Sequence, residues 1–177
     1  MQLVQSTGGE SERMYESLLQ RWLEKGSSYN RLFEEVLVDA RVPAAKRSLV
    51  ITQCLSEFRN FQPQLRLPAR VEKMLDWLNA RFPLFLVTDG GKKLQQAKVD
   101  ALGLAHWISR DNTSISGCFD RNICKPDVRM TSSLKVLRDS KVSPRNVIYC
   151  GDRDVDAAFA ANCGYKFIRV KLMMPIV

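Results

Sequence analysis

The sequence predicts an α/β fold, in which a parallel sheet is covered by helices. Helix and strand patterns alternate from Pro68 onward, as expected where helices connect parallel strands by right-handed crossovers. The short apolar run "PLFLVT" is typical of a strand that is buried on both faces, and "NVIYC" and "YKFIRV" are two further predicted strands. The residues before about position 62 show helical patterns alone. We therefore expect a Rossmann-like core of three layers, with a helical part at its N-terminal side.

Three amphipathic helices are predicted in the N-terminal part. The first ends before Gly26, and the second follows Ser27 and Ser28, a residue type that is common at helix starts. Their apolar positions recur at helical spacing: Tyr15, Leu18, Leu19 and Trp22 in the first helix, and Tyr29, Leu32, Phe33, Val36 and Leu37 in the second. The third runs from Pro43 to Phe58, and the loop "QPQLRLP" ends it.

Helices and strands alternate in the C-terminal part. A helix with Val71, Met74, Leu75 and Leu78 on one face precedes the strand "PLFLVT". The elements that follow are a helix over 92–102, a strand near 114–119, a helix over 127–139, the strand "NVIYC", a helix over 155–163 and the strand "YKFIRV". Gly103 and Gly164 end two of these helices, because glycine readily adopts the left-handed conformation that closes a helix.

A chain of 177 residues can form one ordinary core with a modest addition. We divide it into an N-terminal segment, 1–9, whose role is open, a helical region, 10–66, and a core, 67–177. Residues 2–5 could form a short strand within the N-terminal segment.

The composition disfavours several classes of protein. The longest apolar run, "PLFLV", is too short to cross a membrane, and the first residues do not resemble a signal peptide. Five widely spaced cysteines without a C-x-x-C pair indicate neither a disulfide framework nor a zinc finger, so we expect a cytoplasmic protein. The net charge of +8 would suit an acidic partner, but basic and acidic residues are interspersed, which favours a solvated surface over nucleic-acid binding.

Polar side chains gather where three predicted elements meet one edge of the sheet. Thr88 and Asp89 end the strand in "LVTDG", Lys125 precedes a helix in "ICKPD", and Asp152 and Asp156 follow a strand in "YCGDRDVD". Each has an ordinary structural interpretation when it is taken alone, since aspartate is common at helix starts and threonine in strands. Together they indicate a site, because ligands bind at the carboxyl ends of parallel strands.

A calcium loop is excluded for the three aspartates of "GDRDVD". Asp152, Asp154 and Asp156 match the first, third and fifth positions of an EF-hand. The sixth position, which should be glycine, is Ala157, and the twelfth, which should be a bidentate glutamate, is Cys163. We expect Asp154 to be solvated or to cap the helix.

The order of "LVTDG", "KPD" and "GDRDVDAAFAANCG" resembles motifs II, III and IV of the haloacid dehalogenase-like hydrolases. The likeness spans about residues 68–170, and the helical region, 10–66, is similar to the inserted cap of that superfamily. The resemblance implies a phosphatase-type reaction on a small phosphorylated metabolite. It assigns a phosphate-binding and catalytic role to Thr88 and Lys125, with further hydrogen bonds from the backbone around Asp89 and Gly90.

The same resemblance implies a Mg²⁺ cofactor. Asp152 and Asp156 would face the ion, directly or through water, with the hard oxygen ligands that Mg²⁺ requires.

Motif I of the superfamily is missing from the sequence. That motif is a D-x-D at the end of the first strand, whose first aspartate attacks phosphorus. A forced alignment of "QSTGG" places Gln5 and Thr7 at the two positions, and glutamine cannot form an acyl phosphate. We favour a natural start further upstream over a protein that has lost its nucleophile. The strand of motif I lies between those of motifs II and IV, so residues 2–5 could replace it, or the two flanking strands could close up.

Three functions remain open at this point. The first is a Mg²⁺-dependent phosphatase that is complete only with motif I, and therefore inactive as this chain. The second is a catalytically dead binding or interaction protein on the same fold, and the third, disfavoured above, is a nucleic-acid-binding module. An exposed sheet edge would favour a homo-oligomer. His106, the one histidine, is expected to pack at a helix end and not to act as a base.

Overall fold

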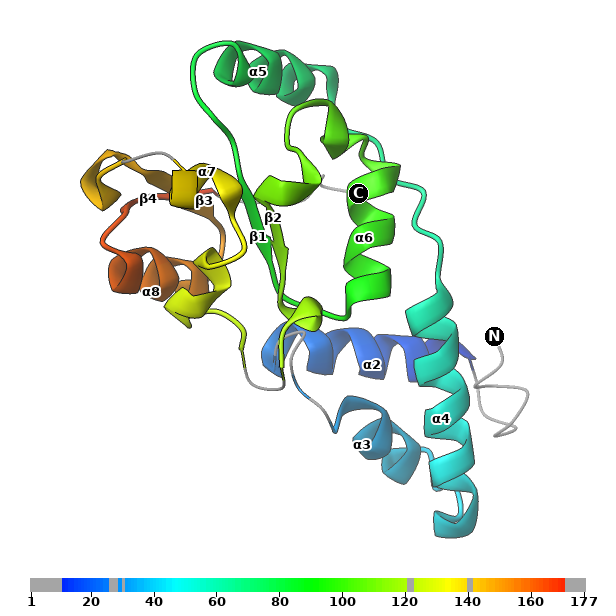
Figure 1. Ribbon diagram of the computed structural model, residues 1–177. Coiled ribbons are helices and arrows are strands. Elements are labelled where there is room, and N and C mark those ends of the chain that lie inside the picture. Colours follow the sequence, from blue (N-terminus) through cyan, green and yellow to red (C-terminus); the bar gives the residue numbers. More distant parts are fainter. Residues whose placement is uncertain (1–10, 26–28, 30, 121–122, 140–141, 171–177) are drawn as a thin grey trace. The chain divides into compact units, whose positions relative to one another are not determined.

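The computed structural model describes residues 11–25, 29, 31–120, 123–139 and 142–170. The chain divides into two compact units, 1–61 and 62–177, which are drawn in blue to cyan and in green to red in Figure 1.

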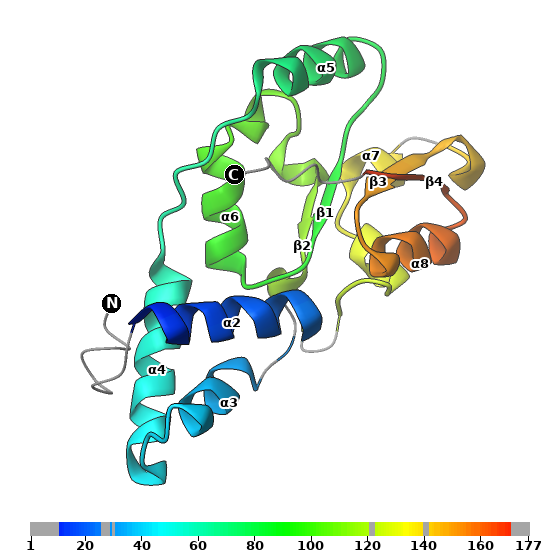
Figure 2. The same cartoon turned by 180° about the vertical axis from the view of Figure 1, so that it is seen from behind.

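The first unit contains the helices α2 (Ser11–Lys25), α3 (Leu32–Asp39) and α4 (Ala44–Asn60) within its described residues. The α3 helix packs against both α2 and α4 (Figure 2). Their shared core is formed by Met14, Val36, Leu37, Val42 and Val50. The three predicted helices are therefore confirmed.

The apolar face predicted for the first helix is only partly buried. Tyr15 and Trp22 are exposed, and Met14 carries the packing of α2 on α3 and α4 instead. Hydrophobic spacing alone does not distinguish a face that packs within its own unit from one that stays exposed.

The second unit alternates helices and strands along the chain. Its helices are α5 (Ala69–Asn79), α6 (Lys92–Ala101), α7 (Lys135–Asp139) and α8 (Asp154–Cys163). Its described strands are β1 (Leu86–Thr88), β2 (Thr113–Ile115), β3 (Ile148–Gly151) and β4 (Lys166–Arg169). Within the described part of this unit, five single 3₁₀ turns lie between these elements, at Leu104–His106, Arg110–Asn112, Ser116–Cys118, Val128–Thr131 and Pro144–Asn146. No described helix is long and apolar enough to cross a membrane.

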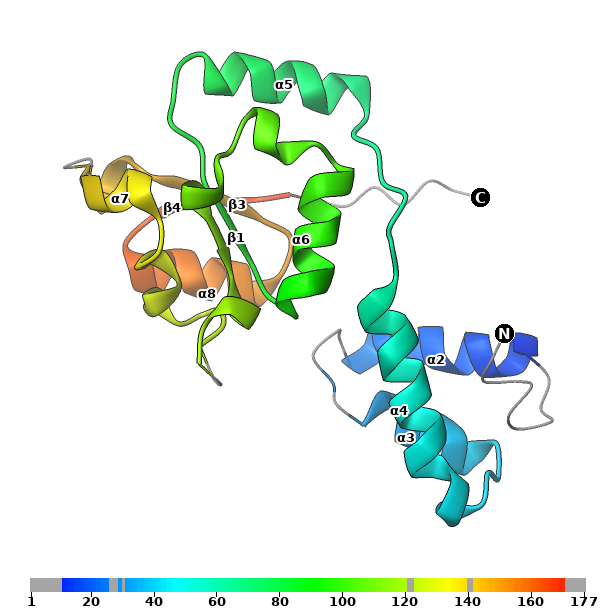
Figure 3. The same cartoon turned by 45° about the vertical axis from the view of Figure 1, so that its right-hand side comes forward.

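The strands pair in parallel, as predicted, but within the described residues they form two sheets and not one. In the first sheet Val87 of β1 lies opposite Ser114 of β2, and in the second Tyr149 of β3 lies opposite Phe167 of β4. Figure 3 shows the second pair, β3 and β4, with α8 against both strands.

A tyrosine side chain joins the two sheets. The Tyr149 hydroxyl donates a hydrogen bond of 3.4 Å to the Val87 carbonyl, and both residues are buried. Within the described residues β1 and β3 do not pair as neighbouring strands, since they belong to different sheets, so the idea that they close up is met by side-chain contacts alone, among them the stacking of Phe85 on Tyr149. The proposed substitute strand, 2–5, lies outside the described residues.

The core of this unit lies where α8 meets the strands. It is built from Val87, Met130, Leu134, Tyr149, Phe159 and Ala160. The α8 helix ends at Gly164, whose φ of 73° confirms the predicted left-handed cap. The α8 helix begins three residues after β3 ends, so its first turn lies at the carboxyl end of that strand.

The predicted helix over 127–139 is wrong in its first half. A 3₁₀ turn, Val128–Thr131, replaces it, and α7 forms only the last five residues. The hydroxyls of Thr131 and Ser132 donate to backbone carbonyls three residues earlier, which competes with a regular helix.

The predicted strand near 114–119 is confirmed only over its first residues. The chain turns at Ser116–Cys118, where the Gly117 amide donates to the Gly90 carbonyl at 3.0 Å. A Cβ atom at Gly117 would lie 2.4 Å from the Lys92 amide nitrogen, so glycine is needed for this approach. The turn brings Ser116 beside the carboxyl end of β1.

Candidate functional site

The end of β1 presents one hydroxyl and one amide that are both engaged within the unit. The Thr88 hydroxyl donates to Gln95 Oε1 on α6 at 3.2 Å, and the Gly90 amide donates to the Ser116 hydroxyl at 2.9 Å. Gly90 has a φ of 136°, a conformation that favours glycine. Both donors can bind an anion only by exchanging these uncharged partners for it.

Lys125 joins the two strand ends. Its backbone amide donates to Asp89 Oδ1 at 3.0 Å, and its Nζ lies 2.5 Å from Asp156 Oδ1 and 3.8 Å from Asp89 Oδ2. The Lys125 side chain is only 8% exposed. A lysine at this depth needs nearby carboxylates, because an unpaired buried ammonium is strongly unfavourable.

Asp156 is the most buried acid of the site, at 5% side-chain exposure. Its Oδ2 accepts from the Arg153 amide at 3.1 Å, which closes the first turn of α8. Burial raises the pKa of the Asp156 carboxyl, but the hydrogen bonds from Lys125 Nζ and the Arg153 amide outweigh it and lower the pKa below its usual value. Asp156 is therefore ionised at neutral pH.

Gly151 makes room for Asp156. A Cβ atom at position 151 would lie 2.4 Å from Asp156 Cβ and 2.8 Å from Asp156 Oδ2. The glycine before the first aspartate of "GDRDVD" is thus required by close packing.

Arg153 completes what we call the charge cluster: Asp89, Lys125, Arg153 and Asp156. Arg153 Nη2 lies 3.8 Å from Asp89 Oδ2, the same oxygen that faces Lys125. Two carboxylates and two cations therefore meet at the carboxyl ends of β1 and β3.

Asp152 and Asp154 lie outside the charge cluster. Asp152 is exposed, and its backbone carbonyl accepts from Arg169 Nη1 at 3.0 Å. Asp154 Oδ1 accepts from Arg169 Nη2 at 2.6 Å while its side chain stays 97% exposed. Asp154 is thus solvated, as expected. Arg169 contacts the segment after β3 at two points, the Asp152 carbonyl and the Asp154 carboxylate.

The fit of Mg²⁺ to these residues is partial. Among the described residues, no group of three or more histidine, cysteine, aspartate or glutamate side chains is placed to hold a metal ion. Mg²⁺ commonly keeps several waters and takes only one or two protein carboxylates. The exposed Asp152 can supply one, and each oxygen of Asp156 retains a lone pair beside the hydrogen bond that it accepts.

Sequence reasoning missed four residues at this site: Gln95, Ser116, Arg153 and Arg169. Arg153 stands inside "GDRDVD", so its position between two acids was a usable signal. Ser116 and Arg169 gave none, because their contacts depend on the turn after β2 and on the register of β4.

A surface hollow of about 620 Å³ lies elsewhere in the second unit. It is lined by Gln62, Pro63, Lys92, Lys93, Gln96, Ala97, Asp100 and Ala101, and none of the charge cluster takes part. The hollow is open to solvent, whereas the charge cluster gathers buried charged groups at strand ends, so the charge cluster is the better candidate for chemistry. His106 is exposed, 3.9 Å from Asp76 and in edge-to-face contact with Trp107, which is away from the cluster.

Comparison with known proteins gives one family. A family model described as haloacid dehalogenase-like hydrolase matches residues 12–170. No curated protein matches the chain.

Proposed function

We propose a function from one established premise: the chain belongs to the haloacid dehalogenase-like hydrolase family. The second unit would serve as a three-layer Rossmann-like core and the helical region as its cap. The charge cluster would bind the phosphoryl group of a small phosphorylated metabolite, next to Mg²⁺. The observation that carries this proposal is the convergence of Lys125 with Asp89 and Asp156, from segments 36 and 31 residues away, at the ends of two parallel strands.

Binding of a phosphoryl group would use donors from both sides of Lys125. The Thr88 hydroxyl and the Gly90 amide would turn from Gln95 and Ser116 to phosphoryl oxygens. The Lys125 ammonium would neutralise part of the negative charge while Asp156 holds it in place.

Mg²⁺ would be held by Asp152 and Asp156, directly or through water. Bound there, the ion would supply positive charge to stabilise a phosphoryl group in transfer. Asp156 would be ionised when it binds Mg²⁺ and Lys125, since its lowered pKa keeps the carboxylate charged at neutral pH.

Turnover by the 177 residues is not part of the proposal. The family reaction needs an aspartate nucleophile, and the sequence ahead of the helical region offers Gln5 in its place. The second candidate function, a binding protein that performs no chemistry, is favoured by this same residue. A cytoplasmic location suits the five cysteines, all of which are free thiols.

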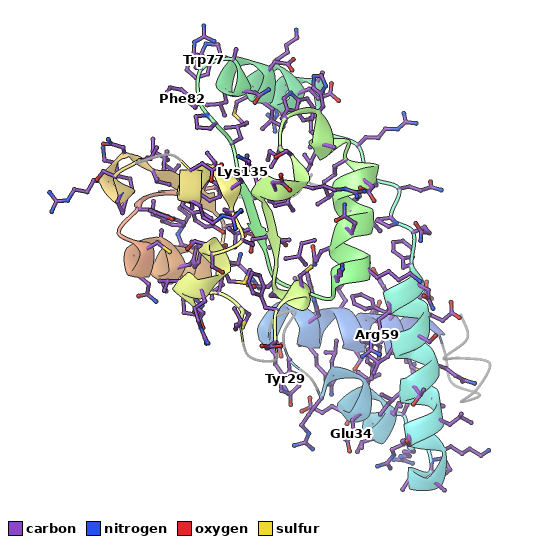
Figure 4. All side chains as sticks on the ribbon, in the orientation of Figure 1. Tyr29, Glu34, Arg59, Trp77, Phe82 and Lys135 are labelled. Atoms are coloured by element: carbon purple, nitrogen blue, oxygen red, sulfur yellow. The ribbon has the colours of Figure 1, made fainter. Side chains whose placement is uncertain are left out.

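The test combines ligand binding with turnover. We expect weak binding of inorganic phosphate by ³¹P NMR, weak binding of Mn²⁺, as a probe for Mg²⁺, by water proton relaxation, and no hydrolysis of 4-nitrophenyl phosphate. Lys125→Ala should abolish phosphate binding, whereas Lys135→Ala, which removes an exposed lysine on α7 (labelled in Figure 4), should leave it unchanged.

Two results would contradict the proposal in different ways. Hydrolysis that disappears in Asp152→Ala would show that the chain is itself an active enzyme. Absence of both phosphate and Mn²⁺ binding in a folded protein would show that the charge cluster is only structural.

A further inference from the structure

The Asp89 carboxylate is shared between both cations of the charge cluster. Its Oδ2 lies 3.8 Å from Lys125 Nζ and 3.8 Å from Arg153 Nη2. Its side chain is 18% exposed, so water only partly screens these interactions. The Asp89 carboxylate therefore already occupies a position near both cations that an incoming phosphoryl group would need.

The cluster as a whole carries no excess positive charge. Asp89 and Asp156 contribute two negative charges, and Lys125 and Arg153 contribute two positive ones, which gives a formal sum of zero. A site for a phosphate dianion would gain from a positive sum, because unlike charges attract and like charges repel at this range. Asp89 is the acid that can be removed without leaving Lys125 unpaired, since Asp156 is the closer partner.

Asp89 also has a positioning role that does not need its charge. Its Oδ1 accepts from the Lys125 backbone amide at 3.0 Å. The side-chain carbonyl of asparagine can accept the same hydrogen bond without a charge. Asp89→Asn therefore separates the electrostatic effect of Asp89 from its effect on the position of Lys125.

We propose that Asp89 is a specificity-determining residue that lowers the affinity of the charge cluster for phosphate dianions by competing for Lys125 and Arg153. This inference rests on the proposed function for the place of the phosphoryl group. Its consequence is a ligand class: singly charged phosphate groups are disfavoured less than doubly charged ones, because repulsion by Asp89 scales with the charge of the ligand.

The experiment measures anion affinity in the full chain. At low salt, Asp89→Asn should bind methyl phosphate, a dianion at pH 8, about threefold to tenfold more tightly than the unchanged protein. The gain should be smaller for dimethyl phosphate, a monoanion, and should shrink as salt screens the charge. Glu72→Gln, which removes an exposed acid from α5, is the matched control and should give no gain.

The outcomes separate this inference from the proposed function. Equal or weaker binding by Asp89→Asn, while the unchanged protein binds, overturns the role of Asp89 and leaves the proposed function intact. An equal gain in Glu72→Gln also overturns it, since net charge alone would then explain the effect. Absence of binding in both proteins overturns the proposed function and this inference together. Asp89→Ser, another neutral acceptor, replaces Asp89→Asn if thermal unfolding shows that variant to be misfolded.

Discussion

Two ion pairs start from the same helical turn and differ in almost every other respect. Asp156 pairs with Lys125 on the inner side of α8, where the two side chains are 5% and 8% exposed. Asp154 pairs with Arg169 on the outer side, where they are 97% and 45% exposed. The two acids are two residues apart in the first turn of one helix. Burial, and not residue type or sequence position, therefore distinguishes the contributions that we expect the two pairs to make to stability.

The difference has an energetic meaning. An exposed ion pair contributes little, because water already solvates both charges. A buried pair costs desolvation when it forms, but removal of one partner leaves the other charge buried and unpaired. The inner pair should therefore be sensitive to mutation, and the outer pair should tolerate it.

The largest effect is expected for Asp156→Ala. This change leaves the Lys125 ammonium buried, with Asp89 at 3.8 Å as its remaining carboxylate among the described residues, and removes the hydrogen bond to the Arg153 amide. We expect the free energy of unfolding to fall by about 3–5 kcal/mol. Urea denaturation at pH 7, followed by circular dichroism, measures it.

The double variant Asp156→Ala with Lys125→Met is the control for that prediction. It removes both charges and should recover part of the lost stability. A loss below 1 kcal/mol in Asp156→Ala would mean that the inner pair behaves like an exposed one.

Acid should weaken the inner pair in a defined direction. The pKa of Asp156 is lowered from its ordinary value of 3.8 by the Lys125 and Arg153 hydrogen bonds, although burial opposes them. The stability gained is present above the unfolded pKa and is lost as pH falls through the lower folded pKa. Urea midpoints between pH 7 and pH 2 should therefore fall less in Asp156→Asn than in the unchanged protein. Equal falls would contradict the lowered pKa.

A smaller loss is expected for Gly151→Ala, which acts on the inner side alone. The new Cβ would stand 2.4 Å from Asp156 Cβ, so Asp156 must shift away from Lys125. Overpacking of this kind costs about 1–3 kcal/mol. Thermal unfolding of Gly151→Ala, compared with Gly91→Ala, which meets no atom within 4 Å, isolates the packing effect. Equal stability of the two variants would show that the site relaxes freely.

The inner pair could be foreseen from the sequence in part. The apolar run before "GDRDVD" and Gly164 after it correctly predicted β3 and α8, and Lys125, Asp156 and Asp89, which the sequence placed at one edge of the sheet, do lie close together. The pairing of Asp156 with Lys125 was not foreseen, because a spacing of four between acids suits a metal ion and a lysine equally well. The depth of burial distinguishes a lysine partner from a metal ion, and it depends on the packing of the whole unit.

The arrangement of strands was harder to foresee. Parallel pairing follows from alternating helices and strands, yet that alternation does not tell whether β1 and β3 belong to one sheet or to two. The Tyr149 hydroxyl donates a hydrogen bond to the Val87 carbonyl of the other sheet, a contact that the alternation of residues along β3 does not encode. The outer pair was equally hidden, because Arg169 reaches Asp154 only through the register of β3 with β4.

The smallest effect is expected for Asp154→Ala. The acid is almost fully exposed, so its pair with Arg169 should contribute less than about 1 kcal/mol to the free energy of unfolding. Arg169 has a second contact, the Asp152 carbonyl, so Arg169→Ala should cost slightly more than Asp154→Ala. A double-mutant cycle of the two residues, measured by urea denaturation, gives their coupling directly. Coupling as large as that between Asp156 and Lys125 would end the contrast between the pairs, since burial could no longer be the cause of the difference.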